Sequence, residues 1–264
     1  MTLAPNAFKA ALKDRHPQIG LWSSLCSSMV AEIIAHAGYD WILIDTEHAP
    51  NELPDVLAQL HAMTGGTAEP IVRPAWNDAV LIKRFMDIGA RTLLLPFVQS
   101  AEEARRAVAA ANYPPYGVRG VATASRAVRY GRAAGYHRAA GAEACVLVQV
   151  ETRAALAEIE AIAAVEGIDG LFIGPSDLAA DFGHLGESGH PEVQAAIADA
   201  CARIRAGGKA PGILAPVEAD ARRYLEMGFL FVAVGSDLGL LARESEALAR
   251  RFKQQVAPQV EPGV

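Results

Sequence analysis

Short apolar runs alternate along the chain with segments of helical periodicity. In the helical segments, apolar residues recur at spacings of three and four, and many of these segments end in glycine, which is a helix stop signal. The runs LVQV, LFIG and FVAV are almost continuously apolar, which is typical of strands buried on both faces of a parallel sheet. The pattern predicts repeated strand–helix units, with strands expected at 19–22, 41–44, 70–73, 92–96, 118–122, 145–150, 170–173, 212–215 and 229–234.

This order of elements predicts an α/β fold, namely a single (β/α)₈ TIM barrel that spans residues 1–264. Nine candidate strands compete for eight places, and we expect the weakest, 118–122, to be loop. An open doubly wound sheet is the alternative, but no GxGxxG motif follows the first strand, so the usual dinucleotide-binding form of that sheet is not indicated.

The segment at about 112–140 interrupts the pattern, because it mixes Pro, Gly, Arg and Tyr without sustained periodicity. We expect a long loop here. Loops of this length in a single domain often act as lids or interface elements, whereas a solvated surface loop is the simpler interpretation. The sequence leaves both open.

Composition narrows the classes of partner. Hydrophobic residues make up 52% of the chain, enough for a sizeable core, and the formal charge of −6 comes without a cluster of Lys and Arg, so we expect no nucleic-acid partner. No apolar run approaches the roughly 18 residues of a membrane span, and no export signal is visible. Cys26, Cys145 and Cys201 show no CxxC spacing, which argues against disulfides or structural zinc and favours the cytoplasm.

Polar residues follow four of the apolar strands directly. Active sites of barrel enzymes lie at the carboxyl ends of the strands, so these residues are expected at one mouth of the barrel. They are Asp45, Thr46, Glu47 and His48 after the second strand, Arg73 after the third, Glu151 after a later one, and Gly174, Pro175, Ser176 and Asp177 after the next.

Glu151 and Asp177 are the candidate metal ligands. Two carboxylates on neighbouring strand ends suit a hard cation such as Mg²⁺ or Mn²⁺, which takes oxygen ligands. The alternative is that each acid only caps the helix that follows it.

His48 and Arg73 are the candidate catalytic side chains. Acids beside His48 suit it to general acid–base chemistry, although it equally suits a hydrogen bond to Asp45 or Glu47. Arg73 is placed to bind a carboxylate or a developing oxyanion, or simply to form a structural ion pair with a nearby acid.

The turn at 174–177 opens a helix whose free N–H groups suit a carboxylate or phosphate, although a plain strand-to-helix turn has the same sequence. Acids, a histidine, an arginine and an anion site together describe a site that enolises an acid next to a carbonyl group.

At these residues the chain resembles the HpcH/HpaI family of class II pyruvate aldolases, the 4-hydroxy-2-oxoheptanedioate aldolase group. The resemblance covers nearly the whole chain. It rests on FKAALK, PQIGLW, DTEHAPN, VRPAWND, DIGARTLLLPFVQ, YPPYGVRG, VLVQVET, GIDGLFIGPSDLAADFG, KAPGIL and FVAVGSDLGLLAR.

The resemblance implies reversible aldol cleavage of a 4-hydroxy-2-oxo acid to pyruvate, or a hydroxypyruvate-like 2-oxo acid, and an aldehyde. It also implies a divalent metal on Glu151 and Asp177, with Mg²⁺ or Mn²⁺ expected and Co²⁺ or Zn²⁺ left open, and a place in aromatic-compound catabolism. No lysine Schiff base is implied.

The resemblance further assigns roles to single residues. Arg73 stabilises the enolate, while His48, paired with Asp87, acts as base through water on the metal, and Asp45 orients the network. The backbone at Ser176 and Asp177, with Gly174 nearby, binds the carboxylate. Trp22, Gln149 and Leu214 line the pocket, Leu214 on the aldehyde side. Thr46 departs from the Gly that many members carry, which puts only pocket shape in doubt.

Family members form hexamers, often trimers of dimers, which implies a homo-oligomer with Asp87, Arg119 and Arg126 near subunit contacts. The alternatives are a 2-dehydro-3-deoxyglucarate-type aldolase, a citrate-lyase-like enzyme for CoA esters, and a regulatory barrel without activity. Retention of His48, Arg73, Glu151 and Asp177 argues against the last.

Overall fold

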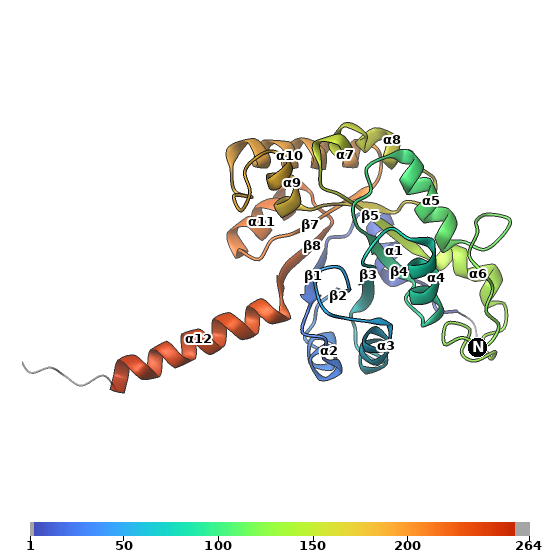
Figure 1. The fold of residues 1–264 in the computed structure, drawn as a ribbon, viewed down its shortest axis with the longest axis horizontal. Helices are drawn as coiled ribbons and strands as arrows, with labels where there is room; N and C mark the ends of the chain where they lie inside the picture. Colours follow the sequence, from blue (N-terminus) through green and yellow to red (C-terminus); the bar gives the residue numbers. More distant parts are fainter. Residues whose placement is uncertain (1–2, 257–264) are drawn as a thin grey trace, which may run out of the picture.

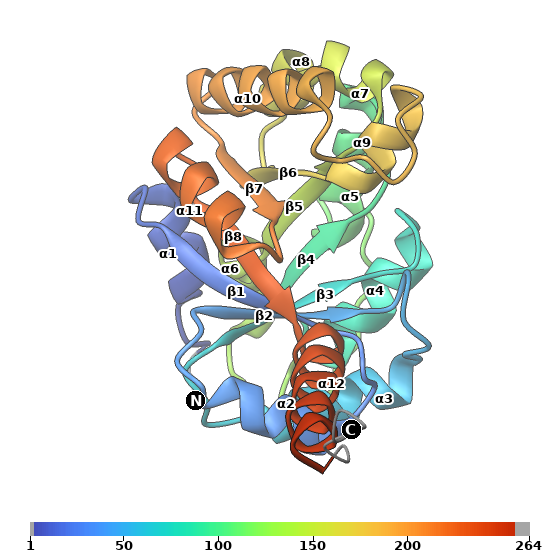
Figure 2. The same cartoon turned by 90° about the vertical axis from the view of Figure 1, so that its left-hand side faces the viewer.

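The computed structural model describes residues 3–256, in which eight parallel strands close into a barrel in sequence order (Figures 1 and 2). This confirms the predicted (β/α)₈ barrel. The strands are β1 (Gln18–Ser23), β2 (Trp41–Asp45), β3 (Glu69–Arg73), β4 (Thr92–Leu95), β5 (Cys145–Val150), β6 (Gly170–Ile173), β7 (Ala210–Leu214) and β8 (Phe231–Ser236). The helices are α1 (Ala7–Lys13), α2 (Ser28–Ala35), α3 (Leu53–Ala62), α4 (Ala79–Asp87), α5 (Ala101–Ala111), α6 (Tyr136–Glu143), α7 (Arg153–Ala157), α8 (Ile159–Ala163), α9 (Pro175–Asp181), α10 (Pro191–Ala206), α11 (Glu218–Met227) and α12 (Asp237–Val256).

The strand boundaries depart from the sequence prediction mainly near the end of the chain. As expected, 118–122 is loop. Strand β8 begins two residues later than predicted, because the amide of Phe229 still donates to the carbonyl of Tyr224 and closes the end of α11. Strand β7 begins two residues earlier, since Ala210 and Pro211 already pair with β6 although Pro and Gly there suggest a turn.

The loop predicted at 112–140 is shorter than expected. Helix α6 occupies its last part, where buried Tyr136 and Ala140 pack with Val128 of the preceding loop. The segment 112–135 remains without helix or strand and is packed rather than fully solvated. The segment after β5 forms two short helices, α7 and α8.

Alternation along the strands divides the core in two. In β2, Trp41 and Leu43 point into the barrel with Phe172 and Phe231, whereas Ile42 and Ile44 belong to the layer between the barrel and its helices. Gly20 leaves room for the Trp41 ring, because a Cβ at Gly20 would overlap it. The interior is therefore filled by side chains, and a site is available only at the ends of the barrel.

Helix α12 does not return to the barrel wall but extends away from it (Figures 1 and 2). The first residue of α12, Asp237, is buried and holds the start of the helix against the barrel. Its carboxylate accepts hydrogen bonds from the Ser23 hydroxyl and from the amides of Ser24 and Leu25. Beyond this point the helix exposes an apolar stripe at spacings typical of helix–helix packing. The stripe consists of Leu238, Leu241, Leu248 and Phe252.

The structure bears on the expectations about membrane spans and about the cysteines. Among the described residues, no helix has the length and apolar character needed to cross a membrane. Cys26, Cys145 and Cys201 are free thiols, as expected.

Candidate active site

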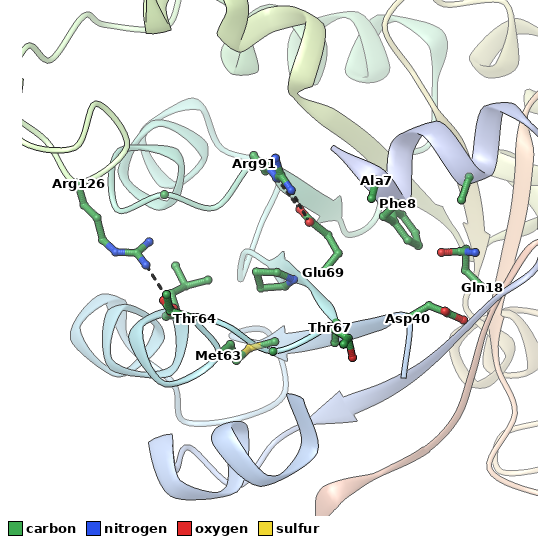
Figure 3. Close-up of a pocket in the computed structure, with 16 residues that line it drawn as sticks. Ala7, Phe8, Gln18, Asp40, Met63, Thr64, Thr67, Glu69, Arg91 and Arg126 are labelled. Atoms are coloured by element: carbon green, nitrogen blue, oxygen red, sulfur yellow. Dashed lines mark hydrogen bonds and ion pairs between the residues drawn. The ribbon is translucent and has the colours of Figure 1, made fainter. Parts of the chain in front are cut away.

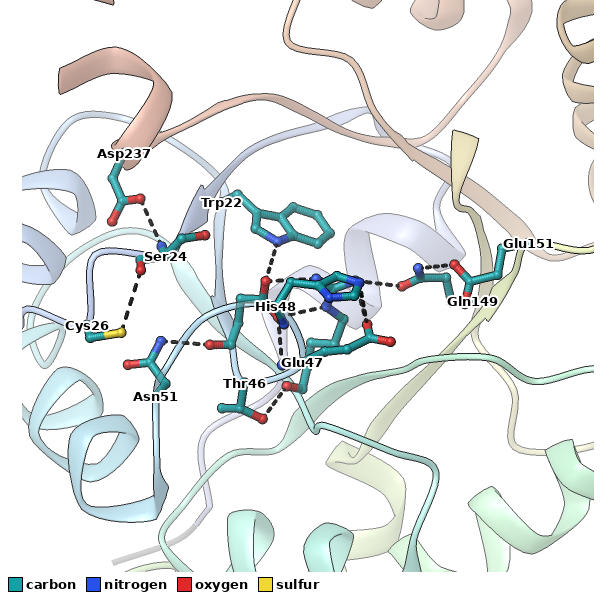
Figure 4. A network of polar contacts seen from close by, with 12 residues as sticks. Trp22, Ser24, Cys26, Thr46, Glu47, His48, Asn51, Gln149, Glu151 and Asp237 are labelled. Carbon is teal, nitrogen blue, oxygen red and sulfur yellow. Dashed lines mark hydrogen bonds and ion pairs between the residues drawn. The ribbon is translucent and has the colours of Figure 1, made fainter. Parts of the chain in front are cut away.

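The period of two along the strands brings the predicted site residues to the inner face at the carboxyl end of the barrel (Figure 4). Trp22 lies at the end of β1, Asp45 and Arg73 end β2 and β3, and Gln149 lies near the end of β5. Asp45 and Arg73 face each other directly, because they are register partners in the β2–β3 pair. Glu151 follows Val150 with the same alternation as Gln149 and is likewise buried.

Arg73 and Asp45 form a buried, two-pronged ion pair. Arg73 Nε lies 2.9 Å from Asp45 Oδ1, and Nη2 lies 2.8 Å from Oδ2. Burial alone would raise the pKa of Asp45, but the hydrogen bonds and charge of Arg73, together with the amides of Glu47 and His48, outweigh it and lower the pKa. The ion pair foreseen as the structural alternative for Arg73 thus forms, and it fixes the direction of the guanidinium.

Three further residues hold Asp45 in place. Trp22 Nε1 lies 3.3 Å from Asp45 Oδ2, and Asn51 Nδ2 donates to the Asp45 carbonyl at 2.7 Å. Gln59 in α3 donates in turn to Asn51 Oδ1 at 2.7 Å. The carboxylate is therefore positioned by a chain of buried polar contacts that reaches from the barrel into its helical layer.

Glu47 is part of the site although the sequence indicated no specific role for it. Its Oε2 lies 2.7 Å from Arg73 Nη1, so Arg73 contacts two carboxylates at once. Burial raises the pKa of Glu47, although the charge of Arg73 opposes the shift. Its position directly after β2 was the available signal, but sequence could not show whether its side chain turned inward.

His48 stands at the edge of this network with its imidazole exposed. The backbone amide of His48 lies 3.4 Å from Asp45 Oδ1, and its Nε2 lies 3.9 Å from Glu47 Oε2, beyond hydrogen-bond distance. The ring side chain is 67% exposed. The structural alternative of a ring hydrogen-bonded to Asp45 or Glu47 is therefore not what forms, and the imidazole faces the open mouth.

Glu151 is held from both sides by neighbouring groups. Its Oε1 accepts a hydrogen bond from the Phe97 amide at 2.9 Å, and its Oε2 accepts one from Gln149 Nε2. Burial raises the pKa of Glu151 to about 7; the Gln149 hydrogen bond opposes this shift, and the charges of Asp177 and Glu47 add to it. An acid in such surroundings gains most from a nearby cation.

Asp177 lies exposed in the first turn of α9, which follows β6, the strand that pairs with β5 before Glu151. Neither carboxylate acts as a helix cap: Thr152 caps α7 through its hydroxyl, and Gly174 occupies the cap position of α9. Within residues 3–256, the Asp177 carboxylate has no hydrogen-bond or ion-pair partner. The charge of Asp177 contributes to the raised pKa of Glu151, so the two carboxylates are close enough to interact.

Gly174 and Leu214 complete the predicted lining. A Cβ at Gly174 would overlap Glu151 Oε2, so a side chain at this position would force the carboxylate to move. Leu214 ends β7 and packs, half-buried, against the aromatic barrel interior. Ser176 precedes Asp177 in α9 and is exposed.

Asp87 is not brought to His48 within one chain. It is the last residue of α4, a helix of nine residues that begins near the mouth and runs roughly 13 Å toward the opposite end of the barrel. There its carboxylate lies 2.8 Å from Nη2 of Arg119, which is fully buried and stacks on the Tyr113 ring. Arg126 bonds to the carbonyls of Ile88 and Leu60 at the same end.

That opposite end also contains a cavity of about 590 Å³ (Figure 3). Its walls include Gln18, Asp40 and Glu69, which lie at the amino-terminal starts of strands, and Glu69 is paired with Arg91 at 2.7 Å. Active sites of barrel enzymes lie at the other face, where the charged network described above is found. The cavity is therefore not the candidate site.

Two contacts of the site were outside the reach of sequence reasoning. Phe97 has a left-handed backbone with φ of 54°, which directs its amide at Glu151. Its ring stacks on Trp76, with ring centroids 5.6 Å apart, beside the mouth. Sequence gives no sign of a positive φ at an aromatic residue, because glycine or asparagine is the usual choice there.

Comparison with known proteins agrees with this geometry. The family description HpcH/HpaI aldolase/citrate lyase matches residues 18–243. The chain is 60% identical over 248 residues to the 4-hydroxy-2-oxo-heptane-1,7-dioate aldolase of Klebsiella pneumoniae, with 94% of each protein covered. It is 57% identical over 252 residues to a pyruvate aldolase of Rhizobium etli, which covers 96% of this chain and 99% of the relative. The crystal structure of an HpcH/HpaI aldolase/citrate lyase family protein from Burkholderia cenocepacia superposes with a TM-score of 0.92 at 42% identity, over 94% of this chain and 99% of that one.

Proposed function

Because the chain belongs to the HpcH/HpaI aldolase/citrate lyase family, we propose that it is a class II aldolase that cleaves a 4-hydroxy-2-oxo acid reversibly to pyruvate and an aldehyde. The observation that carries this proposal is the convergence of Arg73, Glu151, Asp177 and His48 on one mouth of the barrel. The names of the relatives at 57–60% identity, a 4-hydroxy-2-oxo-heptane-1,7-dioate aldolase and a pyruvate aldolase, support the same reaction.

Glu151 and Asp177 would hold the divalent metal. The donor set fits, because both side chains offer oxygen, neither caps a helix, and burial together with the charge of Asp177 raises the pKa of Glu151 to about 7. Oxygen ligands favour a hard cation, so Mg²⁺ or Mn²⁺ is the proposed metal. When bound, such a cation polarises the carboxylate and ketone oxygens of a 2-oxo acid.

Arg73 and His48 would carry the bond-breaking step. His48 removes the proton from the C4 hydroxyl group, the C3–C4 bond breaks, and the aldehyde leaves while the electron pair becomes the enolate of pyruvate. Arg73, aimed by Asp45 and Glu47, donates to the enolate oxygen. A proton returned to C3 completes pyruvate, and the reverse order describes aldol addition.

The remaining predicted residues would position the substrate. The backbone N–H groups at Ser176 and Asp177 suit the carboxylate of the 2-oxo acid, since they begin α9 and have no partner in the preceding strand. Trp22 and Gln149 form the wall between Arg73 and Glu151. Leu214 would contact the aldehyde portion.

Asp87 would pair with His48 only from a second copy of the chain. Within one chain the two residues belong to opposite ends of the barrel, as α4 separates them. The exposed ring of His48 has room for an acid from outside, and the 112–135 segment beside Asp87 presents the exposed apolar side chains Tyr116, Val118 and Val121. We therefore assign Asp87 and this segment, with Arg119 and Arg126, to a subunit interface.

Helix α12 supports the same conclusion about assembly. Its apolar stripe is exposed although the helix is pinned only at Asp237, and the neighbouring α2 exposes Met29 and Ile33. Exchange of α12 between two chains would cover the exposed apolar side chains of α12 and α2 and would form a two-fold dimer. A hexamer built as a trimer of dimers would contain three such dimers. A cytoplasmic enzyme fits the three free thiols.

The test is exchange of the C3 protons of pyruvate in D₂O, followed by NMR in chelator-treated protein with and without Mg²⁺ or Mn²⁺. Exchange should require the metal and should fall at least about a hundredfold in His48→Ala and Glu151→Gln. His36→Ala, a histidine on the outer surface at the end of α2, is the matched control and should exchange normally. Absence of exchange with any divalent metal would overturn the assignment.

A further inference from the structure

A second group of potential metal ligands lies outside the barrel mouth, in the connection between α9 and α10. His184 belongs to the 182–190 loop, His190 is the cap residue of α10, and Glu192 lies in its first turn. One ligand atom from each of the three side chains lies within 4.8 Å of the other two. The reaction proposed above uses none of them.

We propose that His184, His190 and Glu192 bind a transition-metal ion such as Zn²⁺ at a site separate from the oxygen-ligand site of Glu151 and Asp177. Two imidazoles with one carboxylate are the protein ligands of several zinc enzymes, and they leave a fourth position for water. Imidazole nitrogen favours Zn²⁺, Ni²⁺ and Cu²⁺ over Mg²⁺, so the two sites differ in the metals that they select.

The backbone of this loop is already fixed, which lowers the entropic cost of gathering the ligands. The His184 amide donates to the Ala179 carbonyl at 2.8 Å, and the Glu187 and His190 amides donate to the carbonyls of His184 and Glu187. Gln194 of α10 also bonds to the Ser188 carbonyl at 2.7 Å. The two histidines are therefore held near each other by turns rather than by their own rings.

The side chains are close to the required geometry but have to adjust. His184 Nε2 lies 2.9 Å from Glu192 Oε2, so the two atoms have to separate slightly to reach the roughly 3.3 Å between ligand atoms around a tetrahedral zinc ion. The two rings are stacked with centroids 3.4 Å apart, so one ring has to rotate for both to direct nitrogen at one ion. His190 Nδ1 accepts only a long hydrogen bond, 3.3 Å, from the Glu192 amide, so little is lost when it turns.

The charges around the group are compatible with a cation. The hydrogen bond from His184 lowers the pKa of Glu192, which keeps its carboxylate ionised. Arg153 is one positive charge that acts on Glu192, but it is paired with Asp181 at the end of α9. This pair also links the loop to α7, directly after Glu151, so an ion here would stiffen a segment next to the proposed active site.

The experiment is titration of the full-length protein with Zn²⁺ by calorimetry in excess Mg²⁺, which competes with Zn²⁺ for the oxygen-ligand site. Two variants remove a ligand while keeping its structural contact: His184→Gln retains a donor for Glu192, and His190→Asn retains a good helix cap. His36→Gln is the control, because His36 is exposed at the distant end of α2.

We expect one Zn²⁺ per chain, bound at least about tenfold more weakly by each of the two loop variants and unchanged in His36→Gln. Zn²⁺ should also raise the melting temperature of the unaltered protein in excess Mg²⁺, and this rise should disappear in His184→Gln. Failure to detect Zn²⁺ binding in excess Mg²⁺ would overturn the proposal, and so would binding that survives both substitutions.

Discussion

Gly174 is the residue at which the proposed active site has the least room. The turn from β6 into α9 passes so close to Glu151 that a single methyl group would overlap its Oε2 atom. The absence of a side chain at this position is therefore part of the proposed metal site.

We expect Gly174→Ala to weaken Mn²⁺ binding by about 10- to 100-fold, because Glu151 has to move away from its partners Gln149 and Phe97. Calorimetry with Mn²⁺ measures this directly. Gly189→Ala is the matched control, since a Cβ there meets nothing within 4 Å. Equal Mn²⁺ affinity in the two variants would contradict the role given to Gly174.

Asp45 should make the free energy of unfolding fall more steeply as the pH is lowered into the acid range. Its pKa is lowered in the folded protein, so its ionised form stabilises the fold above the ordinary value of 3.8 and this contribution is lost as the pH falls through the lowered pKa. The difference in free energy of unfolding between the unaltered protein and Asp45→Asn should therefore shrink between about pH 5 and pH 3.

Denaturant unfolding at several pH values measures that difference. Asp199→Asn, on the exposed face of α10, is the comparison variant. Its difference in free energy of unfolding from the unaltered protein should change less over the same pH range. A constant difference for Asp45→Asn would show that its carboxylate is not stabilised by Arg73 in the way the geometry indicates.

Among the elements, α4 depends on a single side chain at its start. Asp78 accepts hydrogen bonds from the amides of Val80 and Leu81, at 2.9 and 3.0 Å, and so satisfies two donors that the helix itself leaves free.

Asp78→Ala should lower the free energy of unfolding by about 1 kcal/mol and the melting temperature by roughly 2–4 °C, whereas Asp78→Asn should lose much less. Differential scanning calorimetry distinguishes the two. Equal losses would mean that the negative charge near the helix dipole matters more than the cap hydrogen bonds.

Strands were the elements most accessible to sequence reasoning, because continuous apolar runs such as 145–150 and 170–173 have few other interpretations. Helix α6 was missed since its packing partner Val128 lies in a loop without periodicity. The residues predicted from the strand ends of β2, β3 and β5 lie together at the carboxyl end of the barrel, and their catalytic roles stay predictions. The inward turn of Glu47 and the left-handed Phe97 depend on tertiary packing, which no local pattern records.

At the scale of the whole molecule, the stripe on α12 should decide the oligomeric state. Leu241→Glu with Leu248→Glu places two charges in the surface that we propose to be exchanged, and burial of unpaired charges is strongly unfavourable. The double variant should be smaller in light scattering coupled to gel filtration, and its aldolase activity should fall with assembly.

Arg250→Glu is the control for that variant, because a residue nine positions after Leu241 lies on the opposite side of the helix. It should retain the native size and activity. A native-sized double variant would show that α12 is not an interface.

Asp87 and His48 lie at opposite ends of the same barrel, so the pairing that we propose for them requires residues from two chains in each active site. Two defective chains would then repair each other: in an oligomer assembled from His48→Ala and Asp87→Asn subunits, some sites combine an intact His48 from one chain with an intact Asp87 from the other. With random mixing about a quarter of the sites regain both residues, so co-expression of two inactive proteins should yield an active one. On this proposal the catalytic unit is the contact between two subunits, and each chain contributes part of the site.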